Sequence, residues 1–311
     1  EKQKQWWLFL TVLFTLRFIL FDMRSVQMTT FLLWATLQSI QWIRKGKDFS
    51  GAALLALAIN IKLLPLAFVF YLIYRNKIKA GVLTCFFYVV YLYLPVFYLG
   101  WERNAALLQQ WFSVINPVNK EWTIEAEDGP SSLVALIPVY LTDTVGVLPF
   151  KRNFITLPVE QVTLILNIVR AFFVILTVWF LRTLPFKAVG NKLRQYWEMS
   201  YLFIVVPLIY PHQQLYAFLY IAPAFIYLSW YFITNWNSIK PKMNAFKWTA
   251  LALVGIIFTP IIGRDVIGSM PYQFLLFYRI LPIATVLLIP ILWICRPFKV
   301  FDRDEQVNIG S

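Results

Sequence analysis

The chain has 311 residues, of which 60% are hydrophobic and only 14% are charged, and its mean hydropathy is +0.65. Soluble domains contain about 25% charged and about 45–50% apolar residues, so this chain has too little polar surface to cover a core in water. The composition excludes a disordered chain, a secreted disulfide scaffold and a soluble α/β enzyme. It indicates an all-α, polytopic membrane protein, because a membrane-spanning helix needs about 20 apolar residues and several such runs are present.

The net charge of +13 comes from 28 lysines and arginines against 15 acidic residues. In a soluble protein this charge would suggest nucleic acid as a partner. Here the basic residues form short clusters between apolar runs, which is typical of cytoplasmic loops, so no nucleic-acid partner is expected. Cys85 and Cys295 both lie inside apolar runs, and a disulfide between them is not predicted.

Apolar runs of spanning or near-spanning length occur at 6–21, 26–43, 51–74, 80–100, 158–181, 197–211, 213–231, 248–262 and 272–295. They predict a single transmembrane domain over residues 1–311 with about eight to ten membrane segments. If the N-terminus lies inside, most of the lysines and arginines fall on one face, in the loops 44–49, 75–79, 182–194 and 235–247 and in the tail. The positive-inside rule makes that face cytoplasmic.

The run 51–74 has basic loops on both sides, with Lys62 and Pro65 near its middle. Proline disrupts a continuing helix, and a lysine inside the membrane needs a partner or water. We therefore expect two half-helices that form a re-entrant hairpin from the cytoplasmic side. The alternative is a tilted single span whose lysine reaches the membrane surface.

The stretch 101–157 forms a long loop that is expected on the outer face, and loops of this length in a compact chain are usually functional. Its apolar part, 131–141, is too short to span a membrane. We expect this part to lie on the outer leaflet or over a cavity. The carboxylates Glu125, Glu127 and Asp128 in the same loop are either further candidate bases or simply solvated loop charges.

Polar residues within or beside the apolar runs are the first candidates for a functional site. Arg17 and Arg279 fall near the outer ends of their runs, where they either reach lipid headgroups or share a site for an anionic, lipid-linked phosphate. His212 is the single histidine and stands at an outer junction, which suits a hydrogen-bonding or phosphate-contacting role. Asp22 is either a general base or the counter-ion of Arg24.

No cofactor is expected from the sequence. One histidine and two cysteines within apolar runs are too few for a metal site of His and Cys ligands. The glycines are scattered, with neither a P-loop nor a Rossmann pattern among them.

Four features follow one another along the chain. They are a tight outer turn from Asp22 to Gln27, the sequence GAALLALAINIKLLPLAFVFYLIYRNK at 51–77, a Ser-Leu pair beginning at Ser132, and Pro-His at 211–212. In this order they resemble glycosyltransferase family 87, the polyprenol-phosphate-mannose-dependent mannosyltransferase-like membrane enzymes of GT-C fold. The resemblance extends over residues 16–225. Its most specific part is Ile-Lys-Leu-x-Pro together with the basic residues that follow this apolar run.

The chain also departs from the family pattern. Members carry Gly-Gln-x-Asn where residues 26–29 read Val-Gln-Met-Thr, and an Asn or Gln where Ser131 precedes the Ser-Leu pair. The family's catalytic carboxylate belongs to the first outer loop, which would lie upstream of Glu1 when the lysine motif is aligned. We therefore expect the general base in missing N-terminal spans, with Asp22 as the alternative.

The resemblance implies inverting transfer of a hexose such as mannose from a polyprenyl-phosphate sugar to a glycolipid or glycan acceptor. The site would lie on the outer, periplasmic side of the bacterial cytoplasmic (inner) membrane. A carboxylate would deprotonate the acceptor hydroxyl, and cations and hydrogen-bond donors would stabilise the leaving phosphate. Membrane lipids are expected as further partners. The implied residues are Asp22 and His212 for catalysis, and Arg24, Gln27, Lys62, Ser132, Gln213 and Arg279 for substrate binding.

Two alternatives stay open at this point. A transporter or lipid flippase would use the same arginines and His212 along a path that reaches both faces. In that case Arg170 and Lys62 would be the only polar side chains deep within the membrane along the path. A non-catalytic membrane subunit would obtain its acid from a partner protein.

Overall fold

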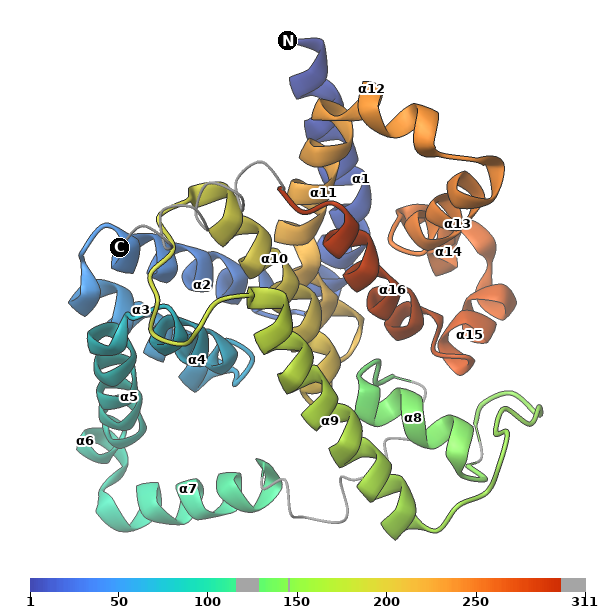
Figure 1. Ribbon diagram of the computed structural model, residues 1–311. Helices are drawn as coiled ribbons and strands as arrows, with labels where there is room; N and C mark the ends of the chain where they lie inside the picture. Colours follow the sequence, from blue (N-terminus) through green and yellow to red (C-terminus); the bar gives the residue numbers. More distant parts are fainter. Residues whose placement is uncertain (116–128, 145, 298–311) are drawn as a thin grey trace. The chain divides into compact units, whose positions relative to one another are not determined.

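A computed structural model gives the structure of the chain and describes residues 1–115, 129–144 and 146–297. All regular structure in these residues is helical (Figure 1), which confirms the predicted all-α, polytopic class. The chain divides into two compact units. Unit 1 is Glu1–Gln27, Glu125–Arg182 and Val189–Ser311, and unit 2 is Met28–Ile124 and Thr183–Ala188. The single transmembrane domain over 1–311 stays a prediction.

Unit 1 contains the longer helices of the chain and a set of short ones. Asn191 begins the helix that follows it, because its side chain accepts hydrogen bonds from the N–H groups of Leu193 and Arg194. The elements are α1 (Lys2–Arg24), α8 (Leu133–Leu141), α9 (Val159–Leu181), α10 (Lys192–Ile209), η2 (Leu215–Ile221), α11 (Ala222–Thr234), α12 (Trp236–Ile239), η3 (Lys240–Lys242), α13 (Ala245–Ile256), η4 (Pro260–Ile262), α14 (Arg264–Ile267), α15 (Ser269–Phe277) and α16 (Ile280–Ile294).

The core of unit 1 surrounds α10. This helix packs against α9, α11 and α16, and its side chains are buried continuously from Trp197 to Leu208. Phe180 of α9 stacks on Trp197 and Tyr201, with ring centroids 4.0 and 4.1 Å apart. The indole N–H of Trp197 donates to the carbonyl of Leu292 in α16, 2.8 Å away. Aromatic packing together with one satisfied polar group therefore holds three helices around α10.

The long helices of unit 1 are antiparallel neighbours. Trp7, near the start of α1, donates to the carbonyl of Ile226 in α11 over 3.0 Å, whereas Phe21, near the end of α1, stacks on Tyr216 of the preceding η2. Helix ends therefore meet in two groups. The basic end comprises the start of α1, the end of α9, the start of α10 and the ends of α11 and α16. The polar end comprises the opposite helix ends.

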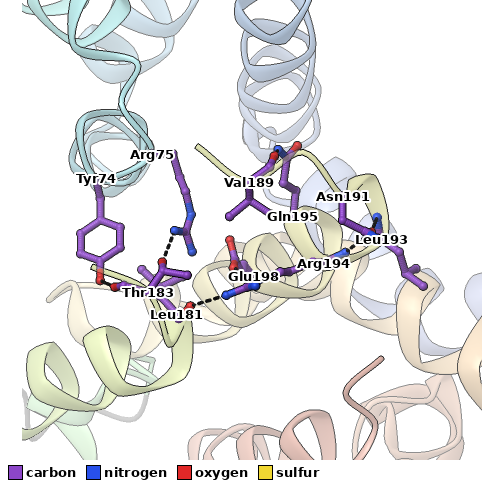
Figure 2. A network of polar contacts seen from close by, with 10 residues as sticks. All are labelled: Tyr74, Arg75, Leu181, Thr183, Val189, Asn191, Leu193, Arg194, Gln195 and Glu198. Carbon is purple, nitrogen blue, oxygen red and sulfur yellow. Dashed lines mark hydrogen bonds and ion pairs between the residues drawn. The ribbon is translucent and has the colours of Figure 1, made fainter. Parts of the chain in front are cut away.

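A buried ion pair marks the basic end. Arg194 Nε lies 3.1 Å from Glu198 Oε1, and Arg194 also donates to the carbonyl of Leu181 at the end of α9 (Figure 2). The hydroxyl of Tyr227 in α11 donates to the carbonyl of Cys295, just after α16, over 2.7 Å. Residues 189–194 of the basic loop, the end of α11 before loop 235–247, and the start of the tail thus share one end of unit 1. The cytoplasmic position of these loops stays a prediction.

Unit 2 contains α2 (Thr29–Arg44), α3 (Asp48–Ile61), α4 (Leu66–Tyr74), α5 (Ile78–Tyr93), α6 (Val96–Leu99) and α7 (Trp101–Ile115). Its core joins the end of α2, both α3 and α4, and the start of α5, through Ile43, Leu55, Ile59, Val69, Leu72 and Ala80. The segment Thr183–Ala188 is tied to the loop after α4. Tyr74 and Arg75 donate to Thr183 (Figure 2), and the N–H of Phe186 donates to the carbonyl of Tyr74. Two loops predicted to be cytoplasmic, 75–79 and 182–194, therefore meet in unit 2.

The predicted break in the run 51–74 is confirmed. α3 ends at Ile61, Lys62 is extended with φ −154° and ψ 136°, and α4 begins after Pro65. Helices of 14 and 9 residues rise about 21 and 14 Å, less than the ~30 Å hydrocarbon core. Neither half spans a membrane alone. The return of the second half to the cytoplasmic side stays a prediction.

Fewer helices have spanning length than the apolar runs suggest. In the described part of the chain, four helices are long and apolar enough to span a membrane, namely Lys2–Arg24, Ile78–Leu99, Val159–Leu181 and Leu215–Thr234. A fifth span is present if Ser269–Phe277 and Ile280–Ile294, bent by 60°, count as one. The run 272–295 breaks at Arg279, which is left-handed with φ 49°. The run 248–262 yields only the 12-residue α13, about 18 Å long.

The segment 131–141 contains α8, which packs against α9, α10 and α16 with one face buried in unit 1. Its predicted place on the outer leaflet or over a cavity stays a prediction. Ala135 and Val139 have no exposed surface. The run is short because α8 belongs to the protein core, where a helix needs no spanning length.

Candidate functional site

The turn after α1 buries a carboxylate at the polar end of unit 1. Asp22 is 2% exposed, and its backbone carbonyl accepts the N–H of Gln27 over 3.0 Å, which closes the turn. Tyr216 of η2 lies within electrostatic range of the Asp22 carboxylate and stacks on the neighbouring Phe21. Arg24, in contrast, is exposed. The two charges proposed as a pair thus have different environments, and Asp22 faces a phenol from another helix.

The segment 211–214 joins this turn to the start of α8. His212 is exposed and left-handed, with φ 57°, whereas Gln213 is buried. The Gln213 side chain donates to the carbonyl of Pro211 over 2.5 Å, and its own backbone carbonyl accepts the N–H of Ser131 over 2.6 Å. Ser131 and the fully buried Ser132 are thereby fixed against the Pro-His junction.

Arg279, at the break before α16, contacts the residues that precede α8. Its side chain is 1% exposed, and Nη1 donates to the carbonyl of Pro130 over 2.6 Å. The hydroxyl of Tyr140 in α8 donates to the carbonyl of the adjacent Tyr278 over 2.7 Å. Arg152 donates to Phe277 over 2.9 Å, and its guanidinium lies 4.5 Å from the centre of that ring. Arg152 and Tyr140 are therefore anchored on the consecutive residues 277 and 278, next to Arg279.

We call the polar side chains at this end of unit 1 the polar cluster. Within it, Arg279 and Gln213 contact Pro130 and Ser131, and Asp22 lies near Tyr216. The cluster contains buried and half-buried polar side chains from α1, α8, η2 and the loops at the polar end, namely Asp22, Ser132, Tyr140, Arg152, Gln213, Tyr216 and Arg279. Four of the predicted site residues are thus brought together: Asp22, Ser132, Gln213 and Arg279. His212 borders the cluster through Gln213.

Three predicted residues lie outside the polar cluster. Arg24 and Gln27 are exposed, and the amide of Gln27 donates to the carbonyl of Ser25 over 3.2 Å. Lys62 belongs to unit 2, where it occupies the break between α3 and α4. Glu125, Glu127 and Asp128 lie outside the residues that the structure describes.

The electrostatics of the cluster favour binding of an anion or of sugar hydroxyl groups. Burial raises the pKa of Tyr140 above its ordinary value, although the charges of Arg152 and Arg279 oppose the shift, so the phenol stays a neutral donor. Ser132 Oγ and Gln213 Oε1 are buried and have no hydrogen-bond partner among the described residues. A buried polar atom without a partner costs about 1–3 kcal/mol, so water or a bound hydroxyl would stabilise both. No group of three metal-ligating side chains occurs in residues 1–115, 129–144 and 146–297.

Tyr140, Arg152 and Tyr216 were missed by the sequence analysis. Tyr140 and Tyr216 look like ordinary aromatic residues of apolar runs, and Arg152 follows Lys151 as one of several loop cations. A usable signal for Tyr216 was its place two residues after the polar interruption 211–214. No local pattern distinguishes Arg152 from the other loop cations.

The fold and the polar cluster define a polytopic helical membrane protein with a charged, largely buried site at one end of unit 1. The sequence profile of glycosyltransferase family 87 matches residues 2–193, which is more than half of the chain. The protein belongs to this family and is a membrane glycosyltransferase, as the sequence motifs predicted. The match includes Asp22 and Ser132, whereas His212, Gln213 and Arg279 lie beyond it. No curated protein and no solved structure gives a significant match.

Proposed function

We propose that the protein transfers a mannose-like hexose, with inversion, from a polyprenyl-phosphate sugar to a glycolipid or glycan acceptor. Family membership supports glycosyl transfer. The observation that carries the finer proposal is the polar cluster, in which a buried carboxylate and two buried guanidinium groups share one end of unit 1. A donor that is part lipid would reach such a site sideways from the bilayer.

The arginines are proposed to hold the donor phosphate. A guanidinium group matches phosphate geometry because its N–H donors are planar and can bind two oxygens at once. Arg279 and Arg152 each donate from Nη1 to a backbone carbonyl, which fixes their orientation. Positive charge fixed in a site of low dielectric stabilises the phosphate as it leaves. Arg279 contacts Pro130, and Gln213 contacts the adjacent Ser131. His212 and Gln213 would therefore contact this phosphate or the acceptor.

Asp22 is proposed as the base within the described cluster. In an inverting transfer, the acceptor oxygen forms a bond to the anomeric carbon as the bond to phosphate breaks, and a base takes the acceptor's proton. Asp22 is the cluster's carboxylate, and it is buried beside Tyr216. A carboxylate outside the polar cluster is the alternative base. Ser132 Oγ and Gln213 Oε1 would then pair with sugar hydroxyl groups.

The polar end is proposed to face the outside of the cytoplasmic membrane. Lysines and arginines gather in the loops that continue the basic end of unit 1, and such loops are retained in the cytoplasm. Because the helices are antiparallel, the polar cluster would lie on the opposite, outer side. Arg24 and Gln27, which are exposed next to Asp22, would lie where substrate enters.

The test uses the chain reconstituted in lipid vesicles with radiolabelled polyprenyl-phosphate mannose and an extract of membrane acceptors. We expect label in a new glycolipid or glycan. Arg279→Lys should lower kcat/KM by about tenfold or more, because a hydrogen bond to a charged group contributes about 1.5–3 kcal/mol. Arg264→Lys, which changes an exposed arginine of α14, is the matched control and should keep the parent rate.

Two outcomes would contradict the proposal. If no polyprenyl-phosphate sugar supports transfer, the donor class is wrong. If Arg279→Lys transfers as fast as the parent, the polar cluster does not hold the phosphate. Asp22→Asn separates the two candidate bases, because full activity would assign the base to a carboxylate elsewhere.

A further inference from the structure

A separate cavity lies near the basic end of unit 1, away from the polar cluster. It has a volume of about 300 Å³, at the lower limit of ordinary ligand sites. Residues from α1, α10 and α11 line it, and most are aromatic. They are Trp7, Leu193, Tyr196, Ile226, Tyr227 and Trp230. A cavity with so apolar a lining suits a hydrocarbon chain.

The cavity walls are held in place by contacts that do not involve a ligand. The indole N–H of Trp7 donates to the carbonyl of Ile226 over 3.0 Å, and the hydroxyl of Tyr227 donates to Cys295 over 2.7 Å. The ring of Tyr227 lies between those of Tyr196 and Trp230, at centroid distances of 6.4 and 5.8 Å. The cavity is therefore formed in advance, which lowers the entropic cost of binding.

Two exposed lysines stand one helical turn from the lining, on the side of the basic end. Lys4 precedes Trp7 by three residues in α1, and Lys192 precedes Tyr196 by four in α10. Residues three or four apart share a helix face. Both helices begin at the basic end, so each lysine lies closer to that end than its aromatic neighbour. Cations thus border an aromatic, apolar cavity on one side.

We propose that this cavity binds one anionic phospholipid, with an acyl chain against the aromatic lining and the phosphate between Lys4 and Lys192. The order of groups matches a phospholipid at a membrane surface, where tryptophan and tyrosine lie at headgroup level and lysine reaches the phosphates. α1 and Leu215–Thr234, which includes α11, both have membrane-spanning length, and five of the six lining residues are half-buried, so the cavity is partly open. The charge of the lysines selects an anionic headgroup over a zwitterionic one.

The test measures lipid binding to the detergent-purified chain by native mass spectrometry, with phosphatidylglycerol as the probe. We expect a one-to-one adduct. The double variant Lys4→Gln and Lys192→Gln should weaken it about tenfold or more, because each lysine near an anionic headgroup contributes to binding. Ile226→Trp, which fills the cavity, should weaken binding of phosphatidylglycerol as well. Lys242→Gln with Lys247→Gln removes the same charge from exposed positions outside the cavity and should leave binding unchanged.

Three results would overturn the proposal. Equal binding of phosphatidylcholine would show a cavity without charge selection. Full competition by inorganic phosphate would show an anion site that takes no acyl chain. An equal loss of binding in the Lys242 and Lys247 variant would show that phosphatidylglycerol follows net charge alone. None of these results depends on glycosyl transfer, so the proposal stands or falls independently of the enzyme's reaction.

Discussion

At the scale of single residues, buried charges have the largest energetic consequences in this protein. Arg194 and Glu198 are both buried, and each compensates the charge of the other (Figure 2). A buried pair adds little to stability compared with well-packed apolar residues, but a single buried charge costs several kcal/mol. The pair therefore fixes how α9 and α10 meet at the basic end, because Arg194 also contacts the carbonyl of Leu181.

We expect Arg194→Met to lower the free energy of unfolding by about 3–5 kcal/mol, because it leaves the Glu198 carboxylate buried without its cation. The double variant Arg194→Met with Glu198→Met should recover much of this loss. Denaturation of the purified protein in detergent, followed by circular dichroism, measures both. If the double variant loses as much as the two single changes combined, the ion pair is not what couples these positions.

His212 allows a test of function with little effect on folding, because its side chain is exposed. Its backbone is left-handed, a conformation that asparagine tolerates better than alanine. We therefore expect His212→Asn to keep the parent melting temperature but to lower glycosyl transfer by about tenfold or more, the cost of a lost hydrogen bond to a charged group. Transfer at the parent rate would remove His212 from the site.

At the scale of helices, a charged residue followed three positions later by proline marks both breaks, although only the first of the two was predicted. Lys62 and Pro65 made the break between α3 and α4 predictable. The run 272–295 looked continuous, although Pro282 in the first turn of α16 was a signal that the chain restarts there. The packing of α8 against α9, α10 and α16 was not predictable, because hydrophobicity is the same for a helix in lipid and a helix in a protein core.

The packing of α2 on α3 depends on a glycine. A Cβ atom on Gly51 would lie 2.6 Å from the side chain of Ile43 and 2.8 Å from the carbonyl oxygen of Ser39. We expect Gly51→Ala to destabilise the protein by about 1–3 kcal/mol through overpacking, despite the better helix propensity of alanine. Gly190→Ala is the matched control, since no atom lies within 4 Å of its Cβ position. Equal melting temperatures for the two variants would contradict this account.

At the scale of the whole chain, composition was sufficient to predict a helical membrane protein, and motif order was sufficient to predict its family. The members of the polar cluster were only partly predictable. Asp22, Ser132, Gln213 and Arg279 stood out as polar residues among apolar ones or in a motif. Arg152 did not, because its contact with Phe277 joins positions 125 residues apart, which no local pattern reveals.

Orientation in the membrane is the last property that the charge pattern predicts. Arg24 and Lys242 are exposed at the polar end and in the basic loop of unit 1, respectively. We expect a cysteine replacing Arg24 to react with a membrane-impermeant maleimide on intact cells. A cysteine replacing Lys242 should react only after permeabilisation, because its basic loop is retained inside. Ser132 is unsuitable as a reporter because it is fully buried.

The labelling is read in a Cys85→Ser background, because Cys85 is exposed, while the buried Cys295 serves as the internal unreactive control. The reverse pattern would place the polar cluster in the cytoplasm, where a donor carried on the outer leaflet does not reach it. Reaction of both cysteines from the same side would contradict the antiparallel arrangement of α1 and α11 itself. The experiment therefore tests the position of the site and the helix packing that forms it, and each has its own contradicting result.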